Sequence, residues 1–482
     1  ALGVCEPMMS GLGGDGFYHL FMAKRGRAEV FNGSGPAPQA ATLERYKSAI
    51  PLTGPLSISV PGSLAAIGSM HAAHGRLPWA DLVMPAIALA RDGFAVTHTF
   101  RHFAFENKAC LAADARSRKA FIGHELASLI RQPELARTLE EIAADGASSF
   151  YRGRLAARFA AGLAQAGALL VESDLAGFEA QVQAPISTPY RGFEVRQTPP
   201  NSTGFVLLEM LKIVEHFDLA ALSSAERAHV LVEAKKRAFR DREAHGSDPR
   251  FETVPVELLL SEERTSAQAA RIDPNRAAEL PLETEKARGD TTYFCVIDPQ
   301  GNAVSGIQSL NSAFGSGVTA GDTGVLMNNR MAYWHLEEGH ANRLMPGKRV
   351  RHTMNAPMLF KDGALWGVLG TPGGDNQVQV NLQVIVAMLD LGMDPQTAIE
   401  LPRWTSSQSG QSANFPHEGD GALTIESDFG EEVLGALERK SHKLHRVGHL
   451  EGPCAMQAIR LMPNGVRVAA SDTRRDGWAM AY

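Results

Sequence analysis

The sequence predicts an α+β fold in which helices cover both faces of stacked antiparallel sheets. Strand-like runs separated by turn residues occur in two parts of the chain, at residues 17–31 and again from Thr291 onward. Between these parts, apolar residues recur at helical spacing in several long segments. Helices and antiparallel strands that occur in separate runs favour layered packing of helices on sheets.

The first half of the chain begins with a hairpin and then becomes mainly helical. Residues 17–22 and 28–31 are expected to pair, with Arg25-Gly26-Arg27 at the bend. Apolar residues at helical spacing predict helices at 78–92, 134–144, 155–166, 205–216 and 225–242. The charged stretch 261–289 has weak periodicity, so we expect a surface segment or linker there.

The second half is dominated by hairpins, because short apolar runs are separated by turns rich in Asp, Asn, Gly and Pro. The expected strand pairs are 291–297 with 303–308, 358–360 with 364–369, and 458–461 with 466–470. A strong amphipathic helix is predicted at 377–391, and a shorter one at 395–401.

The composition is that of a globular protein, and we expect it neither to bind nucleic acid nor to cross a membrane. The chain is 44% hydrophobic, and its net charge of -6 comes without a block of basic residues that could follow a phosphate backbone. Its apolar runs are much shorter than the roughly 20 residues that span a bilayer. The 4 cysteines are far apart and form no CxxC pair, so we expect buried hydrophobic side chains rather than a disulfide framework.

The start of the chain lies inside an apolar segment, with no methionine and no cleavage signal before it. We therefore expect the gene product to begin earlier. A bacterial-type cytoplasmic or periplasmic location is expected, with the cytoplasm favoured.

Two patterns resemble cofactor or metal motifs without the context that such motifs need. Residues 11–16 match GxGxxG, but a strand pattern follows them instead of the helix that receives a pyrophosphate. A tight turn is expected, and a dinucleotide-dependent oxidoreductase is kept as a distant alternative. His71 with His74, and His335 with His340, lack carboxylate or cysteine companions at ligand spacing. No metal or other cofactor is expected.

Two threonines, Thr291 and Thr292, open the first strand of the second half. Threonine at a strand start is ordinarily only a β-branched strand former. A threonine that becomes a chain terminus is different, because its hydroxyl can attack while its own α-amine, with a pKa of about 8 in model peptides, accepts the proton. Cleavage between Asp290 and Thr291, by attack of the Thr291 hydroxyl on the preceding carbonyl, would create such a terminus.

The sequence around Thr291 resembles the catalytic-subunit signature of gamma-glutamyltransferases. The similar segments are 289–298, 301–304, 309–311, 314–315, 321–324, 328–329 and 370–374. Further similarity lies at 11–16, 60–62, 90–93, 199–200, 241–242, 402–403 and 471–472. The resemblance covers nearly the whole chain in the order that the family has.

This resemblance implies a four-layer αββα sandwich of the N-terminal-nucleophile hydrolase type, with extra helices in the N-terminal part. It implies autocleavage into a large subunit, 1–290, and a small catalytic subunit, 291–482, which together form one compact unit. A homodimer of the cleaved heterodimer is also consistent with it. Thr291 matches the nucleophile, Ser309 stands where the family has a threonine beside it, and Asn311 matches a substrate-binding asparagine. Gly373 and Gly374 match the glycines whose amides form the oxyanion hole.

The residues expected to bind substrate depart from the glutamyl-specific pattern. Asn32 replaces an arginine that holds the α-carboxylate, and an amide cannot form a bidentate charged clamp. The remaining departures are Arg330, Tyr333, His352 and Thr353.

Arg330 and His352 add donors or positive charge, which would suit a smaller acid without an α-amine. Similar members include glutaryl-cephalosporin acylases and oxamate amidohydrolases. The alternative is that Arg330 and His352 form ion pairs within the protein and do not bind substrate. The prediction is an amidohydrolase that acts on a small carboxylate-bearing amide, with gamma-glutamyl transfer or glutathione hydrolysis as the alternative.

Overall fold

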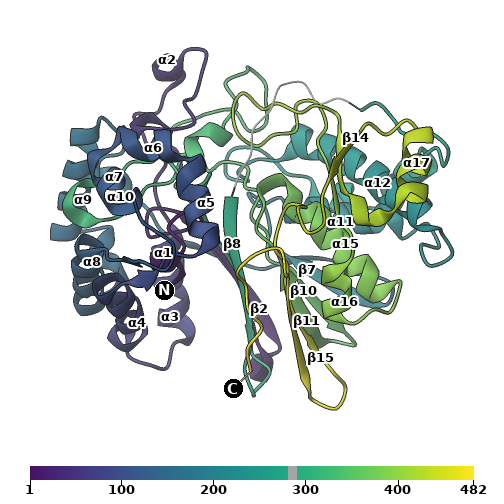
Figure 1. Cartoon of the computed structure of the whole chain (residues 1–482), viewed down its shortest axis with the longest axis horizontal. Helices are drawn as coiled ribbons and strands as arrows, with labels where there is room; N and C mark the ends of the chain where they lie inside the picture. The colour runs from purple at the N-terminus through teal and green to yellow at the C-terminus, as the bar shows by residue number, and fades with distance from the viewer. Residues whose placement is uncertain (281–289, 482) are drawn as a thin grey trace.

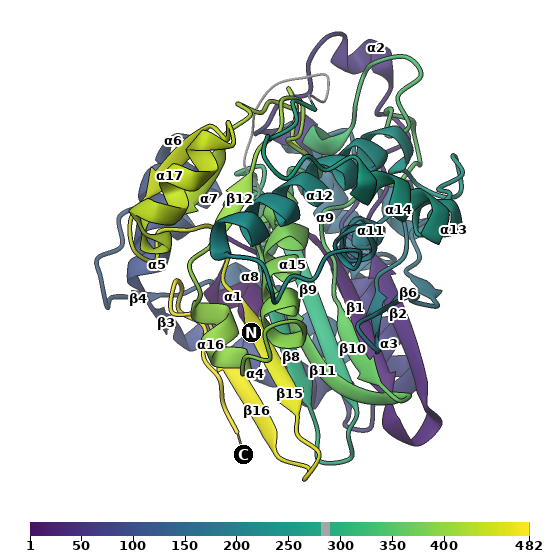
Figure 2. The same ribbon diagram turned by 90° about the vertical axis from the view of Figure 1, so that its right-hand side faces the viewer.

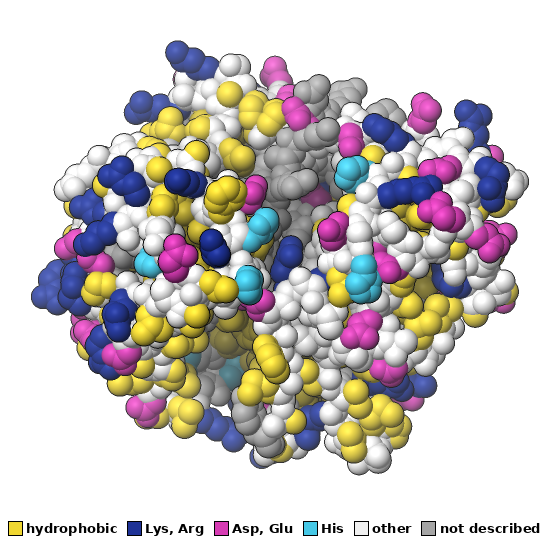
Figure 3. Space-filling model, viewed as in Figure 1, with side chains coloured by type: hydrophobic (Ala, Val, Ile, Leu, Met, Phe, Trp, Pro, Cys, Tyr) yellow, Lys and Arg dark blue, Asp and Glu magenta, His cyan; other side chains and the backbone are white. Residues whose placement is uncertain are grey.

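Two sheets packed face to face form the centre of the computed structural model, which describes residues 1–280 and 290–481. Helices cover the outer face of each sheet, so the molecule has the four layers of an αββα sandwich (Figure 1). The predicted α+β class is confirmed. None of the described helices is long and apolar enough to span a bilayer. On the face drawn in Figure 3, basic and acidic side chains are interspersed.

The first sheet has the strand order β5-β2-β1-β9-β8. Its strands are β1 (Asp15–Met22), β2 (Arg27–Gly33), β5 (Gln181–Gln183), β8 (Asp290–Ile297) and β9 (Ala303–Asn311). The two predicted hairpins, β1–β2 and β8–β9, are both present. Strand β1 pairs with β9, so the N-terminal hairpin and the strands after residue 290 share one sheet.

The second sheet has the order β16-β15-β11-β10-β7-β6. Its strands are β6 (Ile186–Tyr190), β7 (Phe193–Gln197), β10 (Met358–Lys361), β11 (Ala364–Gly370), β15 (Gln457–Leu461) and β16 (Arg467–Ser471). The predicted hairpins β10–β11 and β15–β16 are confirmed. Small accessory sheets consist of β3 (Phe94–Ala95) with β4 (Leu129–Ile130), and of β12 (Trp404–Ser406), β13 (Leu423–Glu426) and β14 (Leu444–Val447).

Apolar side chains fill the space between the two sheets. Phe21 of the first sheet meets Phe360 of the second in an edge-to-face contact, with ring centroids 5.0 Å apart. Both belong to a buried cluster that also contains Met358 and Val368. Because side chains alternate between the two faces of a strand, the opposite face of each sheet remains free to pack against helices.

Helices of the first outer layer come from residues before 180. The main ones are α3 (Ser63–His74), α4 (Trp79–Asp92), α5 (His98–Glu106), α6 (Lys108–Ala113), α7 (Ala115–Phe121), α8 (Pro133–Asp145) and α9 (Arg154–Ala166). Helix α3 lies directly on β1 and β2, where Ala66 packs against Tyr18 and Phe31. The helices predicted at 78–92, 134–144 and 155–166 are confirmed as α4, α8 and α9 within two residues.

The second outer layer, which faces the viewer in Figure 2, lies on the six-stranded sheet. It contains α11 (Gly204–Val214), α12 (Ser224–His245), α14 (Glu262–Ala270), α15 (Gln377–Leu389), α16 (Pro395–Glu400) and α17 (Glu431–Arg439). Helix α15 was predicted to be amphipathic, but it is buried along most of its length because α11 and α12 cover its outer side.

The stretch 261–289 was predicted to be a surface segment or linker, and its first part is a surface helix, α14, rather than a linker. Ser261 caps helix α14 by accepting a hydrogen bond from the Arg264 amide, 3.4 Å away, and Thr265 and Ala269 of this helix are buried. Residues 281–289 lie outside the described part of the chain. Residues 11–16 form the expected turn, since the Gly14 amide donates to the Gly11 carbonyl at 3.1 Å. Strand β1 follows, so the geometry of a dinucleotide site is lacking and that alternative is withdrawn.

Candidate active site

Thr291 lies at an irregularity near the start of β8. Asp290 pairs with Asn311 and Thr292 pairs with Gln308, so the register of the β8–β9 ladder shifts at Thr291. Such bulges re-aim one side chain and are common beside active sites. The Thr291 side chain is buried, and its Oγ1 donates a hydrogen bond to Ser309 Oγ on β9 at 3.3 Å. The predicted nucleophile and its predicted partner are therefore neighbours.

The two glycines predicted to bind an oxyanion follow the end of β11 at Gly370. A Cβ at Gly370 would lie 2.3 Å from the Tyr293 ring, so this end of β11 lies beside the start of β8. Gly373 has φ +126° and Gly374 has φ +55°, a backbone region that side chains with a Cβ rarely adopt. Among the described residues, neither glycine amide has a hydrogen-bond acceptor. Two amides without acceptors are what an oxyanion site requires.

A pocket of about 320 Å³ opens beside Thr291, between β8 and the β15–β16 hairpin. Its lining includes Pro372, which precedes the two glycines, together with Glu6, Arg475 and Trp478. Thr292 Oγ1 donates to Glu6 Oε2 at 2.9 Å, and burial raises the pKa of this carboxyl group. Sequence reasoning missed Glu6 and Arg475, because no local motif links either residue to Thr291.

Asn311 continues the polar row from Thr291 and Ser309. Its backbone amide donates to Ser309 Oγ at 2.8 Å, and its side-chain Nδ2 donates to the Asn329 carbonyl at 3.1 Å and to Asn414 Oδ1 at 2.7 Å. Its φ of +90° is a conformation that asparagine tolerates better than most residues. The side-chain Oδ1 is buried and has no partner within the described chain, so it is available to a donor on a ligand.

Arg330 and His352 converge on one carboxylate, that of Asp15 at the start of β1. Arg330 Nε donates to Asp15 Oδ2 at 3.1 Å, and all three side chains are buried. His352 Nδ1 accepts from the Met354 amide at 3.2 Å, so its Nε2 carries the proton and donates to Asp15 Oδ2, also at 3.2 Å. Burial lowers the pKa of His352 to about 4. His352 is therefore a neutral hydrogen-bond donor, and the predicted alternative that it adds a positive charge is wrong.

This arrangement agrees in part with the alternative of structural ion pairs, because Arg330 and His352 do bind a buried carboxylate of the protein. Arg330 keeps one free donor, since its second terminal nitrogen is buried without a partner among the described residues. Its guanidinium lies over the Tyr333 ring, 4.5 Å from the centroid. The Tyr333 hydroxyl is 3.0 Å from Thr353 Oγ1. The four residues of this region that differ from the glutamyl-specific pattern, Arg330, Tyr333, His352 and Thr353, therefore lie together.

Asn32 is the fifth residue that differs from the glutamyl-specific pattern, and its side chain forms its hydrogen bonds within the protein. Its Nδ2 donates to Gln183 Oε1 at 3.1 Å and to Asn201 Oδ1 at 3.0 Å, while its Oδ1 accepts from the Ser34 hydroxyl at 2.7 Å. An asparagine held in this way lacks a free donor for a substrate carboxylate.

The structure brings two groups of histidines together with a carboxylate, which corrects one sequence inference. His335 and His340, expected to lack such a companion, lie 3.9 Å and 3.5 Å from Glu243 Oε2. That carboxylate is already paired with Arg242 and with Arg351, whose guanidinium is 2.7 Å away. The charge that would attract a metal ion is therefore offset by two guanidinium groups.

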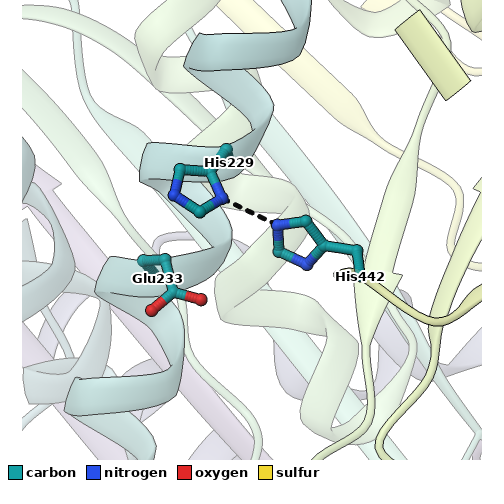
Figure 4. A group of neighbouring side chains, drawn as sticks. All are labelled: His229, Glu233 and His442. Carbon is teal, nitrogen blue, oxygen red and sulfur yellow. Dashed lines mark hydrogen bonds between the residues drawn. The ribbon is translucent and has the colours of Figure 1, made fainter. Parts of the chain in front are cut away.

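The second group joins His229 and Glu233 of α12 to His442 (Figure 4). His229 Nδ1 and His442 Nε2 are 2.8 Å apart, and His229 Nε2 donates to the Asp273 carbonyl at 2.7 Å. Glu233 is bound at 2.7 Å by Lys236 and at 2.9 Å by Arg237. Hydrogen bonds and ion pairs within the protein account for this group without a cation.

Comparison with known proteins shows the family of the chain. The gamma-glutamyltranspeptidase family model matches residues 1–482. The glutathione hydrolase-like YwrD proenzyme of Bacillus subtilis (strain 168) is 38% identical, over 99% of this chain and 91% of its own. The oxamate amidohydrolase proenzyme of Klebsiella pneumoniae (strain ATCC 700721 / MGH 78578) is 35% identical, over 100% and 92%.

A solved structure gives the same result for the fold. The cephalosporin acylase from Bacillus halodurans superposes with a TM-score of 0.91 at 32% identity, covering 100% of this chain and 89% of that one. The named activities of these three proteins differ. The chain is therefore an enzyme of the gamma-glutamyltranspeptidase family.

Proposed function

We propose that this protein cleaves its own chain before Thr291 and then uses the new N-terminal threonine to hydrolyse a small, carboxylate-bearing amide. The observation that carries the proposal is the Thr291 side chain, which is buried at a strand irregularity, bonded to Ser309 and next to a pocket. The names of two relatives support the proposal, since the YwrD protein and the oxamate amidohydrolase are both called proenzymes.

Self-cleavage would begin with attack of Thr291 Oγ1 on the carbonyl carbon of residue 290. The peptide C–N bond breaks as the nitrogen takes a proton, and the chain is then joined by an ester. The α-amine of Thr291 is free from this step on, and water then hydrolyses the ester, which frees the Thr291 hydroxyl and a carboxylate on residue 290. One residue then holds both a nucleophile and a base.

In the catalytic cycle, the Thr291 hydroxyl attacks the amide carbon of the substrate while the α-amine accepts its proton. The Gly373 and Gly374 amides donate to the oxyanion, an interaction worth several kcal/mol in other acyl-transfer enzymes. The proton passes to the leaving nitrogen, the C–N bond breaks, and an acyl ester remains on Thr291. Water, deprotonated by the same amine, releases the acid and restores the hydroxyl.

Two buried atoms without partners in the described chain support the proposed substrate class. The free terminal nitrogen of Arg330 can donate to a carboxylate, and Asn311 Oδ1 can accept from an N–H group. Asn311 is bonded to the carbonyl of Asn329, the residue before Arg330, so both atoms belong to one region of the site. A small molecule that carries a carboxylate and a primary amide, as oxamate does, would satisfy both.

Gamma-glutamyl transfer or glutathione hydrolysis is the alternative, and relatives named glutathione hydrolase motivate it. The observation against it is Asn32, which stands at the place of the expected carboxylate-binding arginine and is fully hydrogen-bonded within the protein. We therefore expect little activity on gamma-glutamyl-p-nitroanilide.

The proposal is tested by mass spectrometry and by ammonia release. Purified protein should consist of two polypeptides, the smaller beginning at Thr291, and should release ammonia from oxamate faster than from glutamine. Thr291→Ala should stay intact, whereas Thr292→Ala, a matched change on the same strand, should still cleave. An intact wild-type chain, or cleavage of Thr291→Ala at the same bond, would contradict the proposal.

A further inference from the structure

Arg242 on α12 is a buried cation that contacts residues close in sequence to the proposed oxyanion site. Its side chain is 1% exposed, and its guanidinium lies over the Phe239 ring, 4.3 Å from the centroid. It donates to the carboxylates of Glu243 and Asp375 and to the carbonyl of Gln411. The guanidinium is planar and has five donors in fixed directions, so it can hold these three acceptors in a defined arrangement.

Two of these acceptors belong to loops that meet at the site. Asp375 directly follows Gly374, and its other oxygen, Oδ2, accepts from the Ala413 amide at 2.7 Å. The Gln411 carbonyl lies on the same loop as Ala413. Arg242 and Asp375 therefore tie the glycine loop, residues 373–375, to the loop of residues 411–413.

The second loop leads back to the nucleophile. Asn414 Oδ1 accepts from Asn311 Nδ2 at 2.7 Å, and the Asn311 amide donates to the Ser309 hydroxyl that Thr291 contacts. Hydrogen bonds and short stretches of backbone thus connect Thr291, through the 411–414 loop, to the residue after Gly374. Arg242 donates to both loops, to Asp375 in one and to the Gln411 carbonyl in the other.

Glycines at positive φ have few intrinsic restraints, so the direction of their amides depends on the residues that follow. We infer that Arg242 is a positioning residue, which orients the Gly373 and Gly374 amides toward the oxyanion through Asp375. The inference rests on the proposed function, because it assumes that these amides bind the oxyanion. It goes beyond the proposed function in assigning a role to a residue that contacts neither the substrate nor Thr291.

The consequence is a specific kinetic effect. An oxyanion develops only in the transition state, so a misdirected amide lowers kcat and leaves KM nearly unchanged. Losing one oxyanion donor, or displacing it by about 1 Å, lowers the rate by about 100-fold in comparable systems. Arg242→Gln should therefore lower kcat by about 100-fold with KM within about threefold of the wild type.

Arg237 provides a matched control on the same helix. It is also buried, donates to Glu233 at 2.9 Å and to the Arg271 carbonyl at 2.6 Å, and touches neither loop. Arg237→Gln removes a comparable ion pair, so it should lower stability to a similar extent and keep kcat within about threefold. Equal losses of kcat in both folded variants would overturn the inference.

Two further measurements keep the test decisive if Arg242→Gln folds poorly. Asp375→Asn removes the charge at the other end of the contact and should lower kcat without raising KM, and adding Arg242→Gln should lower kcat little further. Guanidinium chloride at millimolar concentration should raise the kcat of Arg242→Ala at least fivefold and leave Arg237→Ala unchanged. Additive effects of the paired changes, or no rescue, would contradict the role. Failure of the wild type itself to hydrolyse any amide would instead refute the proposed function.

Discussion

Replacing Arg330 by methionine tests both the buried cluster and the proposed substrate class. The change keeps the length of the side chain but leaves the Asp15 carboxylate, which is fully buried, without its cation. Breaking a buried pair in this way costs about 3–5 kcal/mol. Asp15 would still accept from the Gly35 amide at 2.9 Å and from His352 at 3.2 Å, so we expect the lower end, about 3 kcal/mol.

The free energy of unfolding is best measured by urea denaturation in a Thr291→Ala background, where we expect the chain to stay in one piece. The double change Arg330→Met with Asp15→Asn removes both charges and should cost less than Arg330→Met alone. In the active protein, Arg330→Met should raise KM for oxamate at least tenfold and leave KM for an uncharged amide unchanged. A single change that costs under about 1 kcal/mol, or an equal rise in KM for both substrates, would refute the reasoning.

Three other changes have defined outcomes. His352 has its pKa lowered to about 4 by burial, so below pH 6.5 the unfolded chain takes up a proton that the folded chain does not, and about 3 kcal/mol of stability is lost by pH 4. His352→Gln should remove this part of the pH dependence, seen as the difference between variant and wild-type urea titrations across that window. Gly373→Ala should lower kcat by about 100-fold, because its φ is +126° and a Cβ would lie 2.4 Å from Cys454 Sγ; a normal kcat in this variant would exclude an oxyanion role. Ser309→Ala should lower kcat by about tenfold or more at unchanged KM, measured by steady-state ammonia release, because Thr291 loses its hydrogen-bond partner.

Local patterns were enough to predict most of the fold. The turn at residues 298–302 and the alternating runs on either side of it predict β8 and β9, and the structure confirms their pairing. The helical spacing of residues 78–92 likewise predicts α4. Helix α14 was missed because its sequence is strongly polar, and its buried face depends on contacts with α11 that no local pattern reveals.

The candidate site was predictable only in part, for a similar reason. The roles of Thr291, Ser309 and Asn311 were predicted from the resemblance to the family, and the β8–β9 hairpin brings the three residues to one region. Asp15 and Arg330 are 315 positions apart, and nothing in either segment indicates that they form an ion pair. The contact of Glu243 with His335 and His340 was missed in the same way. Glu243 lies on α12, and only the fold brings this helix beside the distant loop that holds the two histidines.

The most direct test of the account is the identity of the residue that bears the acyl group. Brief incubation of the purified protein with oxamate, acid quenching and peptide mass spectrometry should show the oxalyl group as an ester on a peptide that begins with Thr291. An unmodified Thr291 during rapid turnover, or the acyl group on another side chain, would contradict the account.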